Sequence, residues 1–133
     1  MESQDVYDIT IIGGNTPATT DNLLGMRVDS GTVRTTGTGN ISITGTGSFT
    51  NIPFRHGVQL RNAGVVETTG SGNIIINGTA AASQQAEAIQ MLEGSRIESN
   101  GGGISLVGQG GNSSLGGNRG LSIVDSAIQD LNG

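Results

Sequence analysis

The sequence reads Gly25-Met26-Arg27-Val28 near its start, and the same phrase returns three more times at almost constant spacing. A repeat of about 32 residues is typical of a solenoid, in which each unit buries its apolar face only against its neighbours. The chain is therefore expected to form a stack of similar turns. The later copies of the phrase are Gly57-Val58-Gln59-Leu60, Ala88-Ile89-Gln90-Met91 and Gly120-Leu121-Ser122-Ile123.

Three stretches in each repeat alternate apolar and polar residues, which is the pattern of a short strand with one buried face. The second and fourth residues of each phrase, such as Val58 and Leu60, are expected to face inward. The third residue, such as Gln59, is expected to face solvent. Three strands per repeat predict an all-β parallel β-helix whose equivalent strands pair on successive turns. The second strands are centred on Val33, Val66, Ile97 and Ile128, and the third comprise residues 41–43, 74–76 and 104–106.

The phase of the repeat predicts one β-solenoid domain over residues 1–133, with about four rungs. Complete rungs start near residues 25, 57 and 88, and partial rungs cover 1–24 and 120–133. A third-type strand at 8–11 is expected to be the first, so the chain begins and ends within a rung. Like residues should stack in aliphatic columns, as in Ile41 over Ile74 over Ile104 and Val28 over Leu60 over Met91 over Ile123.

The segments between strands are rich in glycine and asparagine, which favour turns. Asn40 and Asn73 hold equivalent places and are expected to form a side-chain hydrogen-bond ladder. Helix formers gather at 80–88, where we expect one helical turn within a loop.

Composition excludes several classes of protein. There are 24 glycines, no tryptophan and an aromatic fraction of 2%, which favours small regular layers over an ordinary globular core. Cysteine is absent, so disulfides and thiolate metal sites are excluded. Six arginines are spread among eleven acids and no long apolar run occurs, so we expect no nucleic-acid partner and no membrane insertion.

Four variable segments join the third strand of one rung to the first strand of the next: residues 13–24, 45–56, 78–87 and 108–119. Loops gathered on one face of a solenoid often bind ligands. A carbohydrate-binding module is therefore one alternative for the function. The candidate binding residues in these loops are Phe49, Phe54, Arg55, His56, Gln84, Gln85, Asn112 and Arg119.

No catalytic, cofactor or metal site is predicted. His56 is the only histidine, so no histidine metal triad can form, and it is expected to be an ordinary loop residue. A polysaccharide lyase or hydrolase fragment is a weaker alternative, because such enzymes need clustered carboxylates. The charged residues after the first strands instead predict a surface ladder of alternating charge. These are Asp29, Arg61, Glu93 and Asp125.

The stretch from Val33 to Gly47, echoed from Val66 to Thr79, resembles the repeats of filamentous-haemagglutinin-like bacterial surface proteins. The resemblance covers most of the chain and weakens after Gly108. It implies a single-stranded right-handed parallel β-helix, an extracellular or cell-surface location, and a role in adhesion or fibre formation.

Both ends of the solenoid are expected to present open strand edges, which invite pairing. The leading prediction is therefore a structural or adhesive segment that stacks head to tail with copies of itself, a contact that need not close. Glycans or cell surfaces are further candidate partners. The residues expected at the assembling ends are Ile9, Ile11, Leu121, Ile123 and Ile128.

Overall fold

The computed structural model describes residues 2–3, 8–14, 24–48, 54–114 and 116–132, and within these ranges the chain forms thirteen strands and no helix. All strand pairings there are parallel, and they build three sheets. The prediction of an all-β parallel β-helix is confirmed. The solenoid has about three turns of roughly 32 residues each, where about four rungs had been expected.

Each sheet collects one strand from every turn. Sheet A contains, in spatial order, β1 (Glu2–Ser3), β4 (Thr32–Thr35), β7 (Val65–Thr68), β10 (Arg96–Ser99) and β13 (Ala127–Asp130). Sheet B contains β2 (Ile9–Gly13), β5 (Ile41–Thr46), β8 (Ile74–Thr79) and β11 (Ile104–Gln109). Sheet C contains β3 (Met26–Asp29), β6 (Val58–Arg61), β9 (Glu87–Met91) and β12 (Arg119–Ile123).

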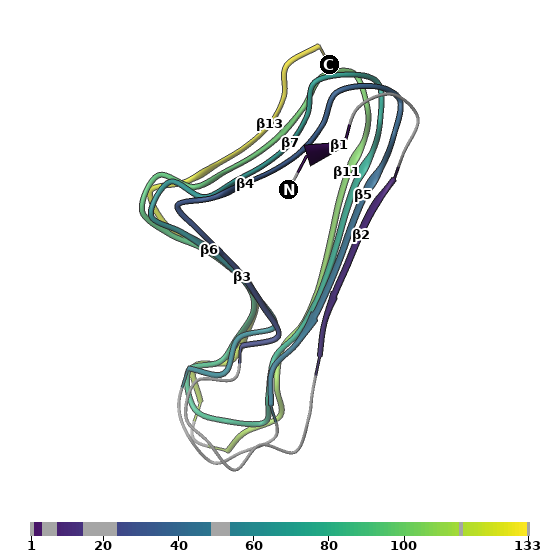
Figure 1. Ribbon diagram of the computed structural model, residues 1–133. Coiled ribbons are helices and arrows are strands. Elements are labelled where there is room, and N and C mark those ends of the chain that lie inside the picture. The colour runs from purple at the N-terminus through teal and green to yellow at the C-terminus, as the bar shows by residue number, and fades with distance from the viewer. Residues whose placement is uncertain (1, 4–7, 15–23, 49–53, 115, 133) are drawn as a thin grey trace.

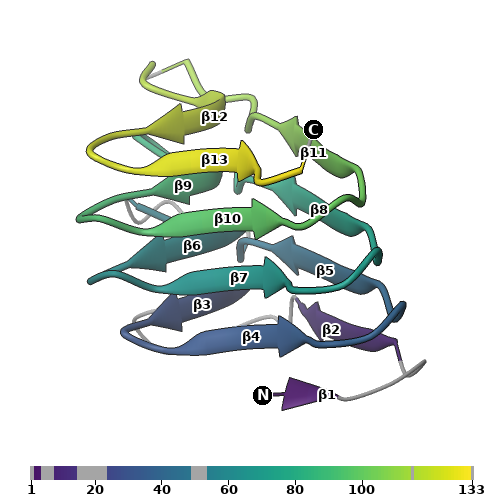
Figure 2. The ribbon, with the colours of Figure 1, turned by 90° about the horizontal axis from the view of Figure 1, so that it is seen from above.

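The solenoid is right-handed. Figure 1 looks along its axis, so that equivalent strands overlap, and Figure 2 shows the same turns stacked from β1 at the bottom to β12 and β13 near the top. From β4 through β5 to β6 the chain runs clockwise in Figure 1 while it recedes from the N-terminal turn nearest the viewer.

The core consists of the predicted aliphatic columns. Ile41 pairs in register with Ile74 and Ile74 with Ile104, and the other inward positions of sheet B continue in this way. In sheet C, Leu60 and Met91 are fully buried between Val28 and Ile123. Residues in the middle turns are buried because a neighbouring turn covers them on both sides.

Polar ladders run up the corners of the solenoid. The predicted asparagine ladder is confirmed: Asn73 Nδ2 donates to Asn40 Oδ1 at 3.2 Å, and the backbone N–H of Asn73 donates to the same oxygen at 2.9 Å. It is longer than expected, since Asp8 Oδ1 accepts from the N–H of Asn40 at 2.7 Å, and Asn73 Oδ1 from that of Gly103, also at 2.7 Å. These side chains satisfy turn N–H groups that have no strand partner.

The predicted charge ladder is present in part at the corner between sheets C and A: Arg61 lies between two acids, but Asp125, the next member, is acidic like Glu93, so the alternation ends there. Arg61 Nε lies 3.5 Å from Asp29 Oδ2 and 3.8 Å from Glu93 Oε2. Because these side chains are partly exposed, each pair contributes about 0–1 kcal/mol.

A seam of glycines divides every turn into two lobes, and this feature was not predicted. A Cβ added to Gly45 would lie 2.2 Å from the carbonyl oxygen of Gly57, and one added to Gly78 would lie 2.0 Å from that of Ala88. Sheets B and C therefore touch backbone to backbone, as the narrowing between β5 and β3 in Figure 1 shows. On one side of the seam lies the aliphatic core; on the other a small lobe packs Ala80, Ala86 and Ala88.

The expected helical turn at 80–88 is wrong. Neighbouring turns accept the backbone N–H groups of this stretch: that of Ala81 donates to the carbonyl of Arg55 at 3.2 Å, and that of Gln85 to the carbonyl of Gly116 at 3.4 Å. Solenoid stacking thus overrides the local helix propensity. The described part of the chain has no helix that is long and apolar enough to cross a membrane.

The start of the solenoid also differs from the expectation. The first strand is β1, which extends sheet A by pairing Glu2 with Arg34 and Ser3 with Thr35. The strand expected to be first is β2. At this end the edge of sheet A is therefore formed by a two-residue strand.

Candidate functional site

The described parts of the variable segments lie together at the small lobe, as their position in the repeat required. Phe54, Gln84, Gln85, Asn112 and Arg119 have exposed or partly exposed side chains there, and Phe54 is 59% exposed. Phe49 lies outside the described residues. The prediction that the remaining two candidates present themselves to a ligand is wrong, because Arg55 and His56 are each only 3% exposed.

Arg55 and His56 are consecutive and precede β6, so strand alternation, which turns successive side chains to opposite faces, does not account for the burial of both. Arg55 takes part in the stack through its carbonyl, which accepts from Ala81, and its Nε has no hydrogen-bond partner among the described residues. Ser48 and Ser83 Oγ are likewise buried without a described partner. The small lobe is therefore more polar inside than the aliphatic core.

His56 forms a close buried pair with Glu87 on the next turn. His56 Nδ1 lies 2.8 Å from Glu87 Oε2 and accepts the backbone N–H of Glu87 at 3.0 Å. That backbone contact makes Nδ1 an acceptor, so the neutral ring carries its proton on Nε2. The single lone pair of Nδ1 is taken by this backbone N–H, so the side chains of His56 and Glu87 are in close contact at 2.8 Å without a hydrogen bond assigned between them.

Burial shifts the pKa values of His56 and Glu87 in opposite directions. Burial lowers the pKa of His56 to about 4, with a smaller lowering from the Arg27 charge, while the backbone hydrogen bond from Glu87 works in the opposite direction. Burial raises the pKa of Glu87, opposed by the charge and hydrogen bond of Arg119. Both shifts disfavour the charged form in a poorly hydrated place.

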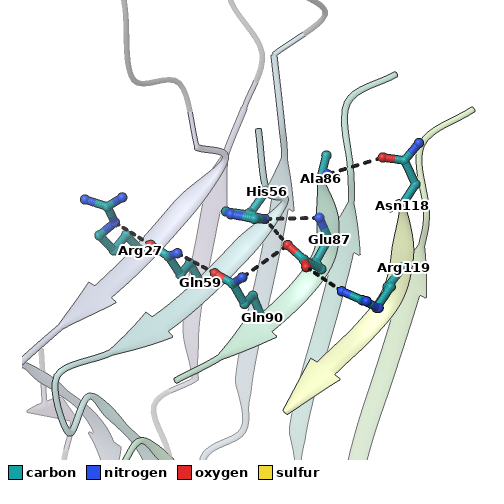
Figure 3. A network of polar contacts seen from close by, with 8 residues as sticks. All are labelled: Arg27, His56, Gln59, Ala86, Glu87, Gln90, Asn118 and Arg119. Carbon is teal, nitrogen blue, oxygen red and sulfur yellow. Dashed lines mark hydrogen bonds and ion pairs between the residues drawn. The ribbon is translucent and has the colours of Figure 1, made fainter. Parts of the chain in front are cut away.

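The pair belongs to a longer polar ladder, drawn in Figure 3, along the outer face of sheet C. Arg119 Nη1 donates to Glu87 Oε1 at 3.2 Å, and Gln90 Nε2 donates to Glu87 Oε2 at 3.1 Å. Gln59 donates in turn to Gln90, and Arg27 Nε donates to Gln59 at 2.8 Å. The ladder joins the four strands of sheet C, β3, β6, β9 and β12.

Gln59 differs from the strand prediction in one detail. Its side chain joins this ladder outside the aliphatic core, but it is only 5% exposed. The alternation of apolar and polar residues in β6 correctly predicted that Gln59 points away from the aliphatic core. It could not predict that this side chain is buried.

The ladder combines acidic, basic and imidazole groups, yet its geometry is that of a structural element. Glu87 is 5% exposed and its carboxyl oxygens are occupied by His56, Gln90 and Arg119. Among the residues that the structure describes, no group of three or more His, Cys, Asp or Glu side chains is placed to hold a metal ion. The spacing of 31 residues from His56 to Glu87 and of 32 from Glu87 to Arg119 was the sequence signal that could have located the ladder.

The two ends of the solenoid differ in exposure. At the C-terminal end Leu121 and Ile123 are 43% and 42% exposed, whereas Ile89 and Met91, one turn below, are fully buried. Ile128 is partly buried. At the N-terminal end Ile9 is 5% exposed, and Ile11 is partly buried. The C-terminal end is therefore the more open of the two aliphatic surfaces.

Comparison with protein-family models, with characterised proteins and with solved structures finds no match to this chain.

Proposed function

We propose that the chain is a structural, adhesive segment of an extracellular bacterial fibre or surface protein, and that copies stack head to tail through the ends of the solenoid. The observation that carries this proposal is the open C-terminal end. There β11, β12 and β13 have no strand on their outer edges within the described residues, and the aliphatic columns end half-exposed at Leu121 and Ile123.

The N-terminal end of a second copy carries matching residues. A copy continuing the stack would place Met26 above Leu121 and Val28 above Ile123, because those residues occupy the same columns. In sheet B, the equivalent aliphatic residues are Ile9 and Ile11, which would lie above Ile104 and Leu106. Burying each half-exposed aliphatic side chain stabilises the junction by on the order of 1 kcal/mol.

The junction would also satisfy backbone groups that the edge strands otherwise leave to water. Neighbouring strands such as β4 and β7, or β8 and β11, pair over four and six residues. Two sheets extended at once would align the copies along one axis and produce an open filament, since nothing in a head-to-tail contact closes it.

Sedimentation velocity over a range of concentrations, followed by negative-stain microscopy, tests the proposal. We expect concentration-dependent oligomers and filaments for the natural chain. Leu121→Asp should weaken association by roughly tenfold or more, because the junction would bury a carboxylate. Ile75→Asp is the matched control: Ile75 is 40% exposed but lies on the outer face of β8, away from both ends. Monomers at every concentration, or equal effects of the two changes, would contradict the proposal.

A second candidate function, carbohydrate binding, is favoured by Phe54. The residue is 59% exposed and its backbone is held at φ 64°, a strained value for a bulky residue. Exposed aromatic rings offer an apolar face on which sugars pack. Glycan-array binding that is lost in Phe54→Ala but kept in Leu121→Asp would assign the function to the small lobe.

A further inference from the structure

β1 and β13 occupy opposite edges of the same sheet. Sheet A has the order β1, β4, β7, β10, β13. β1 therefore pairs with the edge of β4 that faces the N-terminal end of the solenoid, called here the N-terminal edge of β4. At the other end of the sheet, the outer edge of β13 has no strand partner within the described residues. Figure 2 shows the two strands at the bottom and top of the stack. In the described part of the chain, sheet A has five strands, while sheets B and C have four each.

This surplus strand has a consequence for stacking. If β2 and β3 of a second copy continue sheets B and C beyond β11 and β12, the strand that follows β13 in sheet A is β4 of the second copy. The edge of β4 that must receive β13 is the edge that β1 now covers. The two strands therefore compete for one place.

We infer that the N-terminal edge of β4 is an interaction surface for β13 of a second copy, and that β1 is a short intramolecular occupant that β13 displaces. This inference rests on the proposed end-to-end assembly, whose junction it specifies.

The lengths of the competing strands favour exchange. β1 pairs with β4 at two positions, Glu2 with Arg34 and Ser3 with Thr35. β13 pairs with β10 at four positions, 127 to 130 against 96 to 99. Because β4 and β10 occupy equivalent places in sheet A, β13 can form the same four-residue ladder on β4.

The side chains also match at most positions of this ladder. Ile128 would meet Val33 in the aliphatic column that contains Val66 and Ile97. Gln129, which now donates to Glu98 Oε1 at 2.7 Å, would lie beside Arg34. An amide beside a guanidinium is compatible, because the amide oxygen accepts hydrogen bonds.

One position opposes the exchange. Asp130 would lie against Thr35, in a column where Thr35, Thr68 and Ser99 are buried hydroxyl residues. Burying a carboxylate there is unfavourable. Asp130 should therefore limit the strength of the junction without preventing it.

Disulfide trapping tests the inference, and the absence of cysteine from the natural chain leaves no competing thiol. In the double variant Arg34→Cys with Gln129→Cys, the two thiols of one copy are three strands apart in sheet A. That separation is about 14 Å, too far for an intramolecular bond. In the exchanged junction they face each other in register. We expect a ladder of disulfide-linked multimers on non-reducing gels after mild oxidation.

Two variants serve as comparisons. Arg34→Cys with Glu98→Cys uses an inner strand that never meets β4, so it should give no disulfide-linked multimers under the same oxidation. Glu2→Cys with Arg34→Cys joins β1 to β4 in its present register. Oxidation of that variant should abolish association, and reduction should restore it. Asp130→Ser should strengthen association several-fold in sedimentation.

The outcomes separate this inference from the proposed function. Two results would overturn the exchange and leave end-to-end assembly standing. The first is association that depends on Leu121 while the double variant Arg34→Cys with Gln129→Cys gives no disulfide-linked multimers. The second is association that survives the locking of β1 onto β4. The absence of any association, also in Asp130→Ser, would overturn both the exchange and the assembly.

Discussion

His56 Nδ1 lies 2.8 Å from Glu87 Oε2 on the next turn, and the two residues are only 3% and 5% exposed. They come from different variable segments, 45–56 and 78–87, that share almost no sequence. Their contact connects the small lobe to sheet C, because Glu87 opens β9 while His56 directly precedes a glycine at the seam. The polar ladder therefore links adjacent turns, and replacement of its residues or a change of pH should alter the stability of the fold.

Replacement of Glu87 should separate its hydrogen-bonding role from its charge. Glu87→Gln keeps the size of the side chain and an oxygen to accept from Arg119, but its NH2 group cannot accept the hydrogen bond that Gln90 Nε2 now donates to Oε2, so it should cost about 0.5–1 kcal/mol at pH 7. Glu87→Ala leaves Gln90 and Arg119 without their acceptor and should lower the free energy of unfolding by about 1–3 kcal/mol. Urea denaturation measures both, and equal losses in the two variants would contradict the pairing.

The His56 pKa predicts a loss of stability in mild acid. Its pKa falls from an ordinary 6.5 to about 4 on folding, so the unfolded chain binds the proton first as the pH drops. The contribution of His56 to stability is therefore complete above pH 6.5 and declines as the pH approaches 4, by up to about 3 kcal/mol.

Glu87 should oppose this loss in the natural chain. Its pKa is raised on folding, so the folded state gains a proton before the unfolded state does, and stability from this group rises as the pH falls. Removing the carboxyl by Glu87→Gln should consequently steepen the decline between pH 6.5 and about 4. Thermal melts across this range provide the measurement, and a decline no steeper than that of the natural chain would refute the coupling.

The glycine seam should not tolerate even a methyl group. Gly78→Ala would place a Cβ 2.0 Å from the carbonyl oxygen of Ala88, which forces sheets B and C apart and should cost several kcal/mol or prevent folding. Gly31→Ala is the control, because the nearest atom to its Cβ would be 3.8 Å away. The control should be neutral or stabilising by a few tenths of a kcal/mol. Circular dichroism melts that fail to separate the two would argue against the seam.

Charges placed on the two faces of the rung should differ in effect. Val66→Asp puts an unpaired carboxylate into the aliphatic core, where Val66 is fully buried, and should abolish folding. The strand pattern predicted that Gln59 faces solvent, where an aspartate would do little harm. Since Gln59 is buried in the polar ladder and donates to Gln90 at 2.5 Å, we now expect a loss of about 1–3 kcal/mol. Equal severity in expression and melting assays would mean that the faces are wrongly assigned.

The period, the three strands per turn and the inward columns could all be predicted from the amino-acid sequence. A parallel solenoid stacks equivalent residues of successive turns on one another. Residues that recur at the repeat spacing, such as Ile41, Ile74 and Ile104, are therefore also the residues that contact one another in the fold. The asparagine ladder was predictable for the same reason. Even the glycine seam has a signal, in the recurrence of glycine at 13, 45, 78 and 108.

The burial of individual side chains depended instead on how the turns and the two lobes pack against one another. Gln59 and His56 are polar residues in or next to a strand, and both are buried in contact with residues of adjacent turns: Gln59 with Arg27 and Gln90, and His56 with Glu87. The alanine-rich stretch is helical by propensity, but its N–H groups are accepted by neighbouring turns. Burial, pKa and the competition between β1 and β13 all arise from surfaces that meet across turns, and a pattern read along one strand contains no information about such surfaces.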